Sequence, residues 1–233
     1  MAATAGPRIP PRPREDWDAE VKDALSVLRL PRTSVPPAQT GPPTPAHDGA
    51  GEQPRRRRSP GNLISVLSWH PALMKSWFVF NNHLFDSTIS DRLREIVTVR
   101  TAWQRRSEYE WAQHVAMARM AGLDDTEIDA LSVGPDAPGW DDAERVGLRA
   151  TDELCATRRI SDETWAALGM HYDRRQIMDI VFTVAAYDAL GMALENFDIQ
   201  LDEGARGFAA ADVGAATTPP GQTAGTHRTG AEA

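Results

Sequence analysis

The sequence has 233 residues and a formal net charge of −8 at pH 7. This length fits one domain of ordinary size with tails on either side. The acidic balance creates no overall field that attracts phosphate, so composition argues against a nucleic-acid-binding protein. Cys155 is the single cysteine, which excludes an internal disulfide and a metal site built on a pair of cysteines.

The distribution of apolar residues favours a protein outside the membrane. Residues 1–15 (MAATAGPRIPPRPRE) contain no apolar segment of the kind that a signal peptide needs. No run reaches the ~20 apolar residues of a membrane span, because Asp179, Asp188 and Glu195 interrupt the longest apolar stretch. Together with the lone cysteine, these features lead us to expect a cytoplasmic protein.

Three segments are too poor in apolar residues to form a packed core. Residues 31–58 are rich in Pro, Gly and charge, and their final RRRR run is interpreted as a solvated linker rather than a phosphate site. Residues 1–14 and 206–233 have the same character, and we expect all three segments to be disordered. The ordered part is expected to be a helix at 15–30 that packs on a domain spanning 59–205.

The apolar periodicity of the ordered part is helical throughout. In WDAEVKDALSVL, Trp17, Val21 and Leu25 form one stripe. NLISVLSW and PALMKSWFVFNNHLF predict two helices that separate at His70-Pro71, because proline cannot continue the first of them.

The remaining segments extend this pattern to the end of the domain. Ser90 is placed to cap a helix over DRLREIVTVRTAW, and the next helix, SEYEWAQHVAMARMAG, ends at Gly122, a residue typical of helix C-termini. Four further helices are predicted over DDTEIDALS, DDAERVGLRATDELC, DETWAALGMHY and RRQIMDIVFTVAAYDALGMALENF. No segment shows the sustained two-residue alternation of a strand, so the predicted fold class is all-α.

The segment SEYEWAQH, residues 107–114, has two interpretations. In the first, Ser107 and Glu110 form a capping box, in which the serine oxygen accepts from the third backbone amide and the carboxylate returns to the Ser107 amide. Such a carboxylate stays ionised and is a poor proton donor at pH 7. In the second, Ser107, Glu110 and His114 form one polar column that faces a pocket, where a carboxylate near the imidazole supports proton transfer. The spacing fits both.

The segments RLREIVTVRTAW and RRSEYEWAQHVAMARMAGL together resemble the core motif of the carboxymuconolactone decarboxylase family, which includes the alkylhydroperoxidase D (AhpD) proteins. The resemblance extends to RIPPRPREDWDAEV and to IMDIVFTVAAYDALGMALENFDIQLDEG. It implies an all-α, AhpD-like helical domain that assembles as a homotrimer or homohexamer, with sites close to the subunit contacts. It implies no metal and no organic cofactor for the decarboxylase branch.

The peroxidase branch of this family uses a glutamate, a Cys-x-x-Cys pair and a histidine. By spacing, the glutamate falls on Glu95, the cysteines on Ser107 and Glu110, and the histidine on His114. Because neither cysteine position holds a thiol, the thiolate chemistry of that branch is not expected here.

The decarboxylase branch needs only acid and base groups, so the resemblance implies His114 as the catalytic acid, with Glu95 and Glu110 tuning it or relaying protons. Ser107, Arg100 and His83 are candidates for binding the substrate. Arg100 could reach a substrate carboxylate or pair with a core acid, and His83 could be a pocket residue or a buried, hydrogen-bonded histidine.

The leading functional hypothesis is a cofactor-independent enzyme for decarboxylation, or a related lyase or isomerase step, on a small carboxylate or lactone. The alternatives are a non-catalytic helical oligomer in which SEYEWAQH only caps a helix, and a peroxidase of the AhpD type that uses another nucleophile, such as Cys155. Neither nucleic acid nor membrane is expected as a partner.

Overall fold

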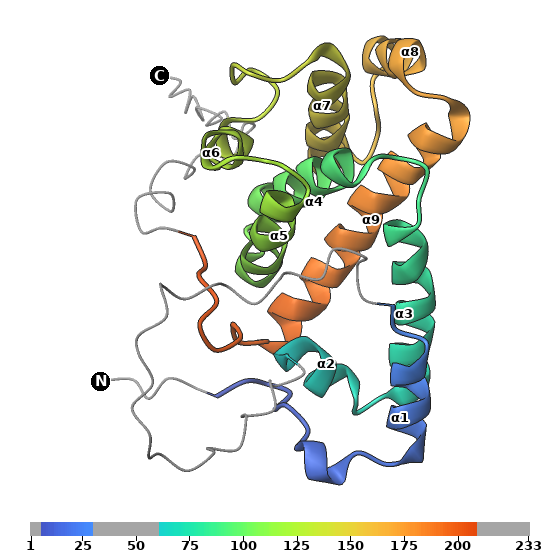
Figure 1. Cartoon of the computed structure of the whole chain (residues 1–233), viewed down its shortest axis with the longest axis vertical. Coiled ribbons are helices and arrows are strands. Elements are labelled where there is room, and N and C mark those ends of the chain that lie inside the picture. The colour runs from blue at the N-terminus through green and yellow to red at the C-terminus, as the bar shows by residue number, and fades with distance from the viewer. Residues whose placement is uncertain (1–5, 30–60, 209–233) are drawn as a thin grey trace, which may run out of the picture.

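The computed structural model describes residues 6–29 and 61–208, and within these ranges it contains nine α-helices, one short 3-10 helix and no strand (Figure 1). The all-α prediction is confirmed. The 3-10 helix η1 spans Arg14–Asp16. The α-helices are α1 (Ala19–Ser26), α2 (Asn62–Leu67), α3 (Pro71–Phe85), α4 (Asp91–Arg105), α5 (Glu108–Met120), α6 (Asp125–Val133), α7 (Asp142–Thr157), α8 (Asp162–His171) and α9 (Arg174–Phe197).

The helix starts follow local side-chain chemistry. The Ser90 hydroxyl accepts a hydrogen bond of 3.1 Å from the Leu93 amide, as predicted for the start of α4. Pro71 occupies the first turn of α3, where its missing N–H costs no helical hydrogen bond. Capping boxes begin α6, α7 and α9, with Asp124, Asp141 and Asp173 as the capping residues.

Helix α4 is the centre of the domain. It packs against α5, α7 and α9, and every residue from Leu93 to Trp103 is buried. In Figure 1, α4 and α9 cross near the middle of the molecule, α6 to α8 lie beyond one end of this crossing, and α1 to α3 lie toward the other. Because α4 is buried on all sides, its charged residues must find partners inside the protein.

Helix α9 is long and apolar enough to cross a membrane on length and composition, with a mean hydropathy of 1.6 over an 18-residue window. Half of that window is buried against the rest of the domain.

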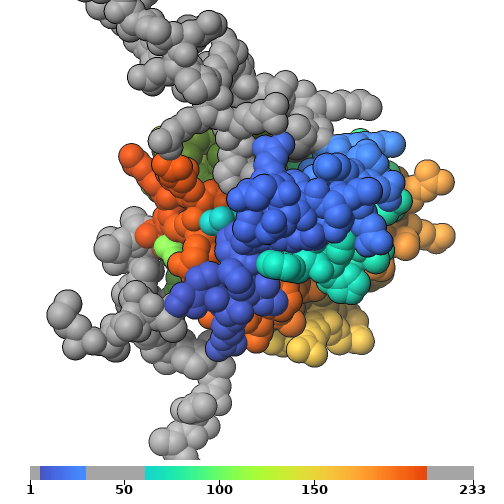
Figure 2. All heavy atoms as spheres, turned by 90° about the horizontal axis from the view of Figure 1, so that it is seen from below, coloured from blue at the N-terminus to red at the C-terminus, as the bar shows by residue number. Residues whose placement is uncertain are grey.

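The N-terminal residues contact the domain earlier than the sequence suggested. The Ile9 amide donates to the Phe197 carbonyl at 3.2 Å, and the Arg12 amide donates to the Ser65 carbonyl at 3.0 Å. Figure 2 shows this segment and α1 lying over α2, α3 and the end of α9. At the other end, the Phe208 ring packs on Trp103 and Trp111. Ile9, Arg12 and Phe208 were predicted to belong to disordered tails, but they contact the domain. The predicted disordered segment at 31–58 lies outside the described residues.

Candidate functional site

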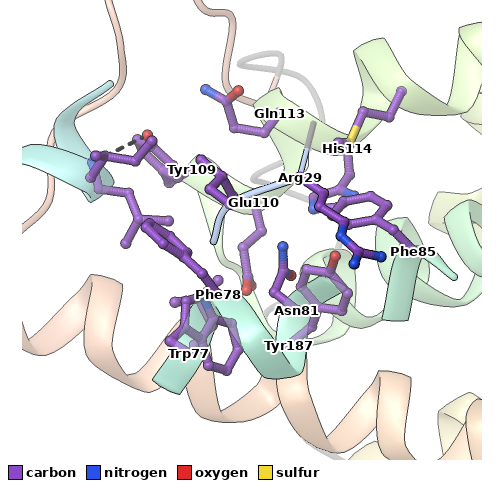
Figure 3. Close-up of a pocket in the computed structure, with 15 residues that line it drawn as sticks. Arg29, Trp77, Phe78, Asn81, Phe85, Tyr109, Glu110, Gln113, His114 and Tyr187 are labelled. Atoms are coloured by element: carbon purple, nitrogen blue, oxygen red, sulfur yellow. Dashed lines mark hydrogen bonds between the residues drawn. The ribbon is translucent and has the colours of Figure 1, made fainter. Parts of the chain in front are cut away.

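A cavity of about 200 Å³ lies between α3, α5 and α9, closed on one side by the end of the N-terminal segment (Figure 3). Most of its wall is apolar or aromatic. The apolar and aromatic lining residues are Leu28, Leu63, Ile64, Trp77, Phe78, Phe85, Tyr109, Met117, Tyr187 and Leu190. The remaining lining residues are Arg29, Asn81, Glu110, Gln113 and His114. A space of this kind fits a small, largely apolar molecule with a few polar groups.

His114 and Glu95 form a buried pair at this cavity. The His114 Nδ1 lies 2.8 Å from Glu95 Oε2, and the Glu95 side chain is fully buried. The second Glu95 oxygen accepts from Arg94 Nε at 3.0 Å, and Arg94 also donates to Asp91 at 2.6 Å. Arg94 therefore pairs with one oxygen of Glu95, and the other oxygen holds the His114 imidazole in place.

This pairing decides which nitrogen of His114 is available to a ligand. An imidazole that donates Nδ1–H to a carboxylate leaves Nε2 as its free acid or base. The Tyr187 ring holds the imidazole from the side, edge to face, with the ring centroids 4.6 Å apart. Burial raises the pKa of Tyr187, so this phenol stays neutral. His114 is thus a fixed ring with one nitrogen left for the cavity.

Glu110 is buried in the same cavity wall without a partner. Its exposed fraction is 1%, and neither carboxyl oxygen has a hydrogen bond within the described residues. Burial raises the pKa of Glu110 to about 8; the Ser107 hydroxyl opposes this in part, and the negative charges of Asp188 and Glu195 add to it. Ser107 is close, but no hydrogen bond of good geometry joins the two side chains. At neutral pH, Glu110 is therefore a carboxylic acid.

The capping-box interpretation of this segment is wrong. Helix α5 begins after Ser107, as the box requires, but it has no side-chain cap hydrogen bond. The Ser107 side chain is buried toward α9, where a Cβ built on Gly191 would lie 3.7 Å from Ser107 Oγ and 3.2 Å from Glu110 Oε2. The Ser107 hydroxyl and the Glu110 carboxyl group thus point toward α9 instead of bonding to the first turn of α5. The raised pKa also leaves Glu110 neutral, whereas the capping box requires it to be ionised.

Comparisons with known proteins agree with this architecture. The sequence profile of the Carboxymuconolactone decarboxylase family matches residues 71–153, which run from α3 into α7 and include Glu95, Glu110 and His114. The matched segment is 83 of the 233 residues, so the similarity to this family is carried by the part of the chain that contains the candidate site. The resemblance predicted from the sequence is confirmed. A search of curated proteins found no match.

Solved structures share the superfamily fold at low sequence identity. A protein of unknown function from Agrobacterium tumefaciens, related by name to the antioxidant defence protein AhpD, has a TM-score of 0.55 at 20% identity, over 58% of this chain and 94% of its own. A peroxidase-related protein with an AhpD core from Ralstonia eutropha JMP134 has a TM-score of 0.56 at 18% identity, over 61% and 77%. The debrominase Bmp8 has a TM-score of 0.61 at 12% identity, over 83% and 91%. These identities establish the shared fold alone.

Three of the six predicted site residues lie at the cavity or directly against a residue that lines it. Glu110 and His114 line the cavity, as their helical spacing suggested, and Glu95, which the family resemblance supplied, is bonded to His114 without lining the cavity itself. Ser107 is buried behind Glu110 and does not line the cavity. Its predicted role in substrate binding is therefore not supported by its position.

Arg100 and His83 lie away from the cavity. Arg100 donates to both carboxylate oxygens of Asp152, at 2.6 and 2.8 Å, and to two backbone carbonyls, so it is the core ion pair that was one of its two interpretations. His83 Nε2 lies 3.1 Å from Asp179 Oδ1 and joins α3 to α9, with its side chain 59% exposed. A substrate role for Arg100 or His83 at this cavity is a prediction that the structure corrects.

The structure adds lining residues that were not predicted as site residues. In Figure 3 the Glu110 carboxyl points toward Asn81 and Tyr187, and Arg29 lies near Phe85 at another side of the cavity. Tyr187 could have been recognised from the sequence, because it is a polar aromatic residue within the apolar stretch of α9. Arg29 had no such signal, because it directly precedes the proline-rich segment.

Proposed function

We propose that this protein is a cofactor-independent acid/base enzyme that acts on a small carboxylate or lactone by decarboxylation or a related lyase or isomerase step. The observation that carries the proposal is the pair of acid/base groups at one cavity: neutral Glu110 and the fixed imidazole of His114. A carboxyl group kept protonated at neutral pH by an apolar site is suited to donate a proton or a strong hydrogen bond.

The two acidic residues would have different tasks. Glu95 is hydrogen-bonded to both Arg94 and His114, so it would hold the imidazole in one orientation. Glu110 has no such partners and would act on the substrate itself. Buried polar atoms without partners in a cavity wall are the groups that gain most from a ligand that supplies them.

In a decarboxylation, the bond between the carboxylate and its neighbouring carbon breaks, and carbon dioxide leaves. The electron pair of that bond passes into the adjoining carbonyl or lactone group and forms an enolate. Glu110 would donate a hydrogen bond to the developing enolate oxygen. Protonated His114 would then deliver its Nε2 proton to carbon and recover the proton from solvent.

A peroxidase function has less support. The chain has one cysteine, Cys155 of α7. Its side chain is buried in the apolar core that α7 forms with α4, α8 and α9, and it does not line the cavity. Burial raises the pKa of the Cys155 thiol to about 11, so little thiolate is present at neutral pH.

The test is a turnover assay with a panel of γ-lactone acids and β-keto acids, with carbon dioxide release and product formation followed by NMR. We expect His114→Ala and Glu110→Gln each to lose about 10²–10⁴-fold in kcat/KM on any converted compound, the usual contribution of general acid/base catalysis. His171→Ala, at an exposed position in α8, is the matched control and should retain full activity.

Equal turnover by the wild type, His114→Ala and Glu110→Gln on every converted compound would contradict the proposal. If no compound is converted, binding of the same acids is measured through the His114 imidazole NMR signals. Absence of any shift would then favour the non-catalytic alternative.

A further inference from the structure

Helix α9 carries an exposed face that is apolar over most of its length. From Met178 to Met192, the exposed positions of this helix are Met178, Phe182, Ala185, Ala189 and Met192. They recur every three or four residues, which is the spacing of a helix-to-helix seam. Met178, Phe182 and Met192 are each more than half exposed, at 59%, 51% and 53%. An apolar stripe of this kind on a folded domain marks a surface for another molecule.

The stripe is bordered by grooves that could receive side chains. One, of about 280 Å³, runs beside Ala185, Ala189 and Met192 and reaches Leu154 and Arg158 at the end of α7. Another, of about 400 Å³, lies between Trp165 of α8 and the Met178 and Phe182 end of the stripe. Ala185 and Ala189 are small and leave a recess in the surface, and the exposed Phe182 side chain projects next to it. The same face therefore carries both a projecting side chain and a recess that could receive one.

The charges at the two ends of the stripe are opposite. Arg174 and Arg175 are exposed at its beginning, and Glu195 is exposed at its end. None of the three has an ion-pair partner within residues 6–29 and 61–208. Arg175 precedes Ala185 by ten positions and Glu195 follows it by ten, so the pattern is symmetric about Ala185 but reversed in charge.

We propose that this face binds a second copy of the chain, with the two α9 helices antiparallel and Ala185 at the two-fold axis. In this arrangement Met178 lies opposite Met192 of the partner subunit. Phe182 enters the recess formed beside Ala189 of the partner subunit, and Arg175 meets Glu195 of the partner subunit. Each contact occurs twice, as a two-fold interface requires. A parallel pair would instead place arginine opposite arginine, which is unfavourable.

The inference does not depend on the proposed function, because the cavity residues lie on another side of α9. It also sharpens the assembly expected from the family resemblance. A dimer, or a hexamer made of three such pairs, contains this two-fold contact, whereas a simple three-fold trimer does not.

The first experiment measures the mass of the full chain by light scattering after gel filtration. We expect an even number of copies for the wild type and half that number for Phe182→Glu, because a buried charge at the recess opposes association. Val133→Glu is the matched control, since Val133 is 64% exposed on α6, and it should leave the mass unchanged. A wild-type monomer or trimer would overturn the proposal, and so would a Phe182→Glu variant that is folded and keeps the wild-type mass.

Disulfide cross-linking tests the geometry without weakening the interface. Ala185→Cys should form a covalent dimer under mild oxidation, because residues at a two-fold axis are within disulfide reach, whereas Val133→Cys should not. A mixture of Met178→Cys and Met192→Cys chains should give mixed dimers, since the two positions are ~21 Å apart within one helix and meet only between antiparallel copies. Cross-linking of Met178→Cys with itself would overturn the antiparallel arrangement, and failure of Ala185→Cys to cross-link would overturn the interface.

Discussion

Two buried glutamates on neighbouring helices have opposite environments. Glu95 on α4 contacts Arg94 on one side and His114 on the other, so both of its oxygens are used. Among the residues that the structure describes, Glu110 on α5 has neither an ion-pair partner nor a hydrogen bond, and burial raises its pKa to about 8. The same side chain is thus a hydrogen-bonded support for His114 in one place and a neutral acid in the other. The difference comes from partners rather than from depth, because both are almost fully buried.

The largest expected effect separates the two residues by stability. Glu95→Gln removes the fully buried one of the two carboxylates that pair with Arg94, and breaking a buried pair from one side costs about 3–5 kcal/mol. Glu110→Gln removes no ion pair and should leave the free energy of unfolding at pH 7 equal or higher. Urea unfolding of both variants measures the contrast. A loss of several kcal/mol in Glu110→Gln would show that Glu110 has a structural partner after all.

The second effect is a pH dependence confined to Glu110. Its pKa is about 8 in the folded protein and 4.5 in the unfolded chain. Between these values the folded state holds one more proton, so stability falls as pH rises, by at most about 1.4 kcal/mol per pH unit. Below the unfolded value and above the folded value, this contribution is flat. Unfolding of the wild type and Glu110→Gln at pH 6 and pH 7 measures it: the advantage of the variant should grow with pH, and a constant difference would contradict the raised pKa.

A smaller effect is expected at Gly191, whose missing side chain leaves room for Glu110. An alanine Cβ there would lie 3.2 Å from Glu110 Oε2, so the carboxyl group must shift. The gain in helix propensity, about 1 kcal/mol, would be offset in part by this contact. Gly191→Ala should therefore lose activity several-fold with little change in melting temperature. Gly169→Ala is the matched control, because its Cβ would meet nothing within 4 Å, and it should gain stability and keep activity.

The smallest effect is expected at Cys155, which lies apart from both glutamates. Its burial and raised pKa predict slow reaction with a thiol reagent at pH 7 in the folded protein. Cys155→Ser should keep any acid/base turnover. If the variant instead loses a peroxide-reducing activity that the wild type has, the peroxidase alternative gains over the proposal.

The sequence predicted the helices well because their boundaries depend on local chemistry. Pro71 and Ser90 mark the starts of α3 and α4, and α9 has the bounds expected from its sequence. The edges of the tails were less predictable, because Ile9 and Phe208 are held by tertiary contacts that no local pattern reveals.

The site was predictable in its residues but not in their states. Helical spacing brings Glu110 and His114 to one face, and the family resemblance supplied Glu95. Spacing could also have excluded Arg100, which lies five positions after Glu95 and so about 140° around the helix. The protonation of Glu110 could not be predicted, because it depends on the burial of its carboxyl group, which comes from tertiary packing next to Gly191 of α9 and not from the local sequence.

The most direct test is the titration of Glu110 itself, followed by the carboxyl carbon signal in ¹³C-glutamate-labelled protein and assigned with Glu110→Gln. We predict a midpoint near pH 8, so that the group is protonated at pH 7. A midpoint near that of an ordinary glutamate, with Glu110 ionised at pH 7, would contradict the account of this site as one that contains a neutral acid.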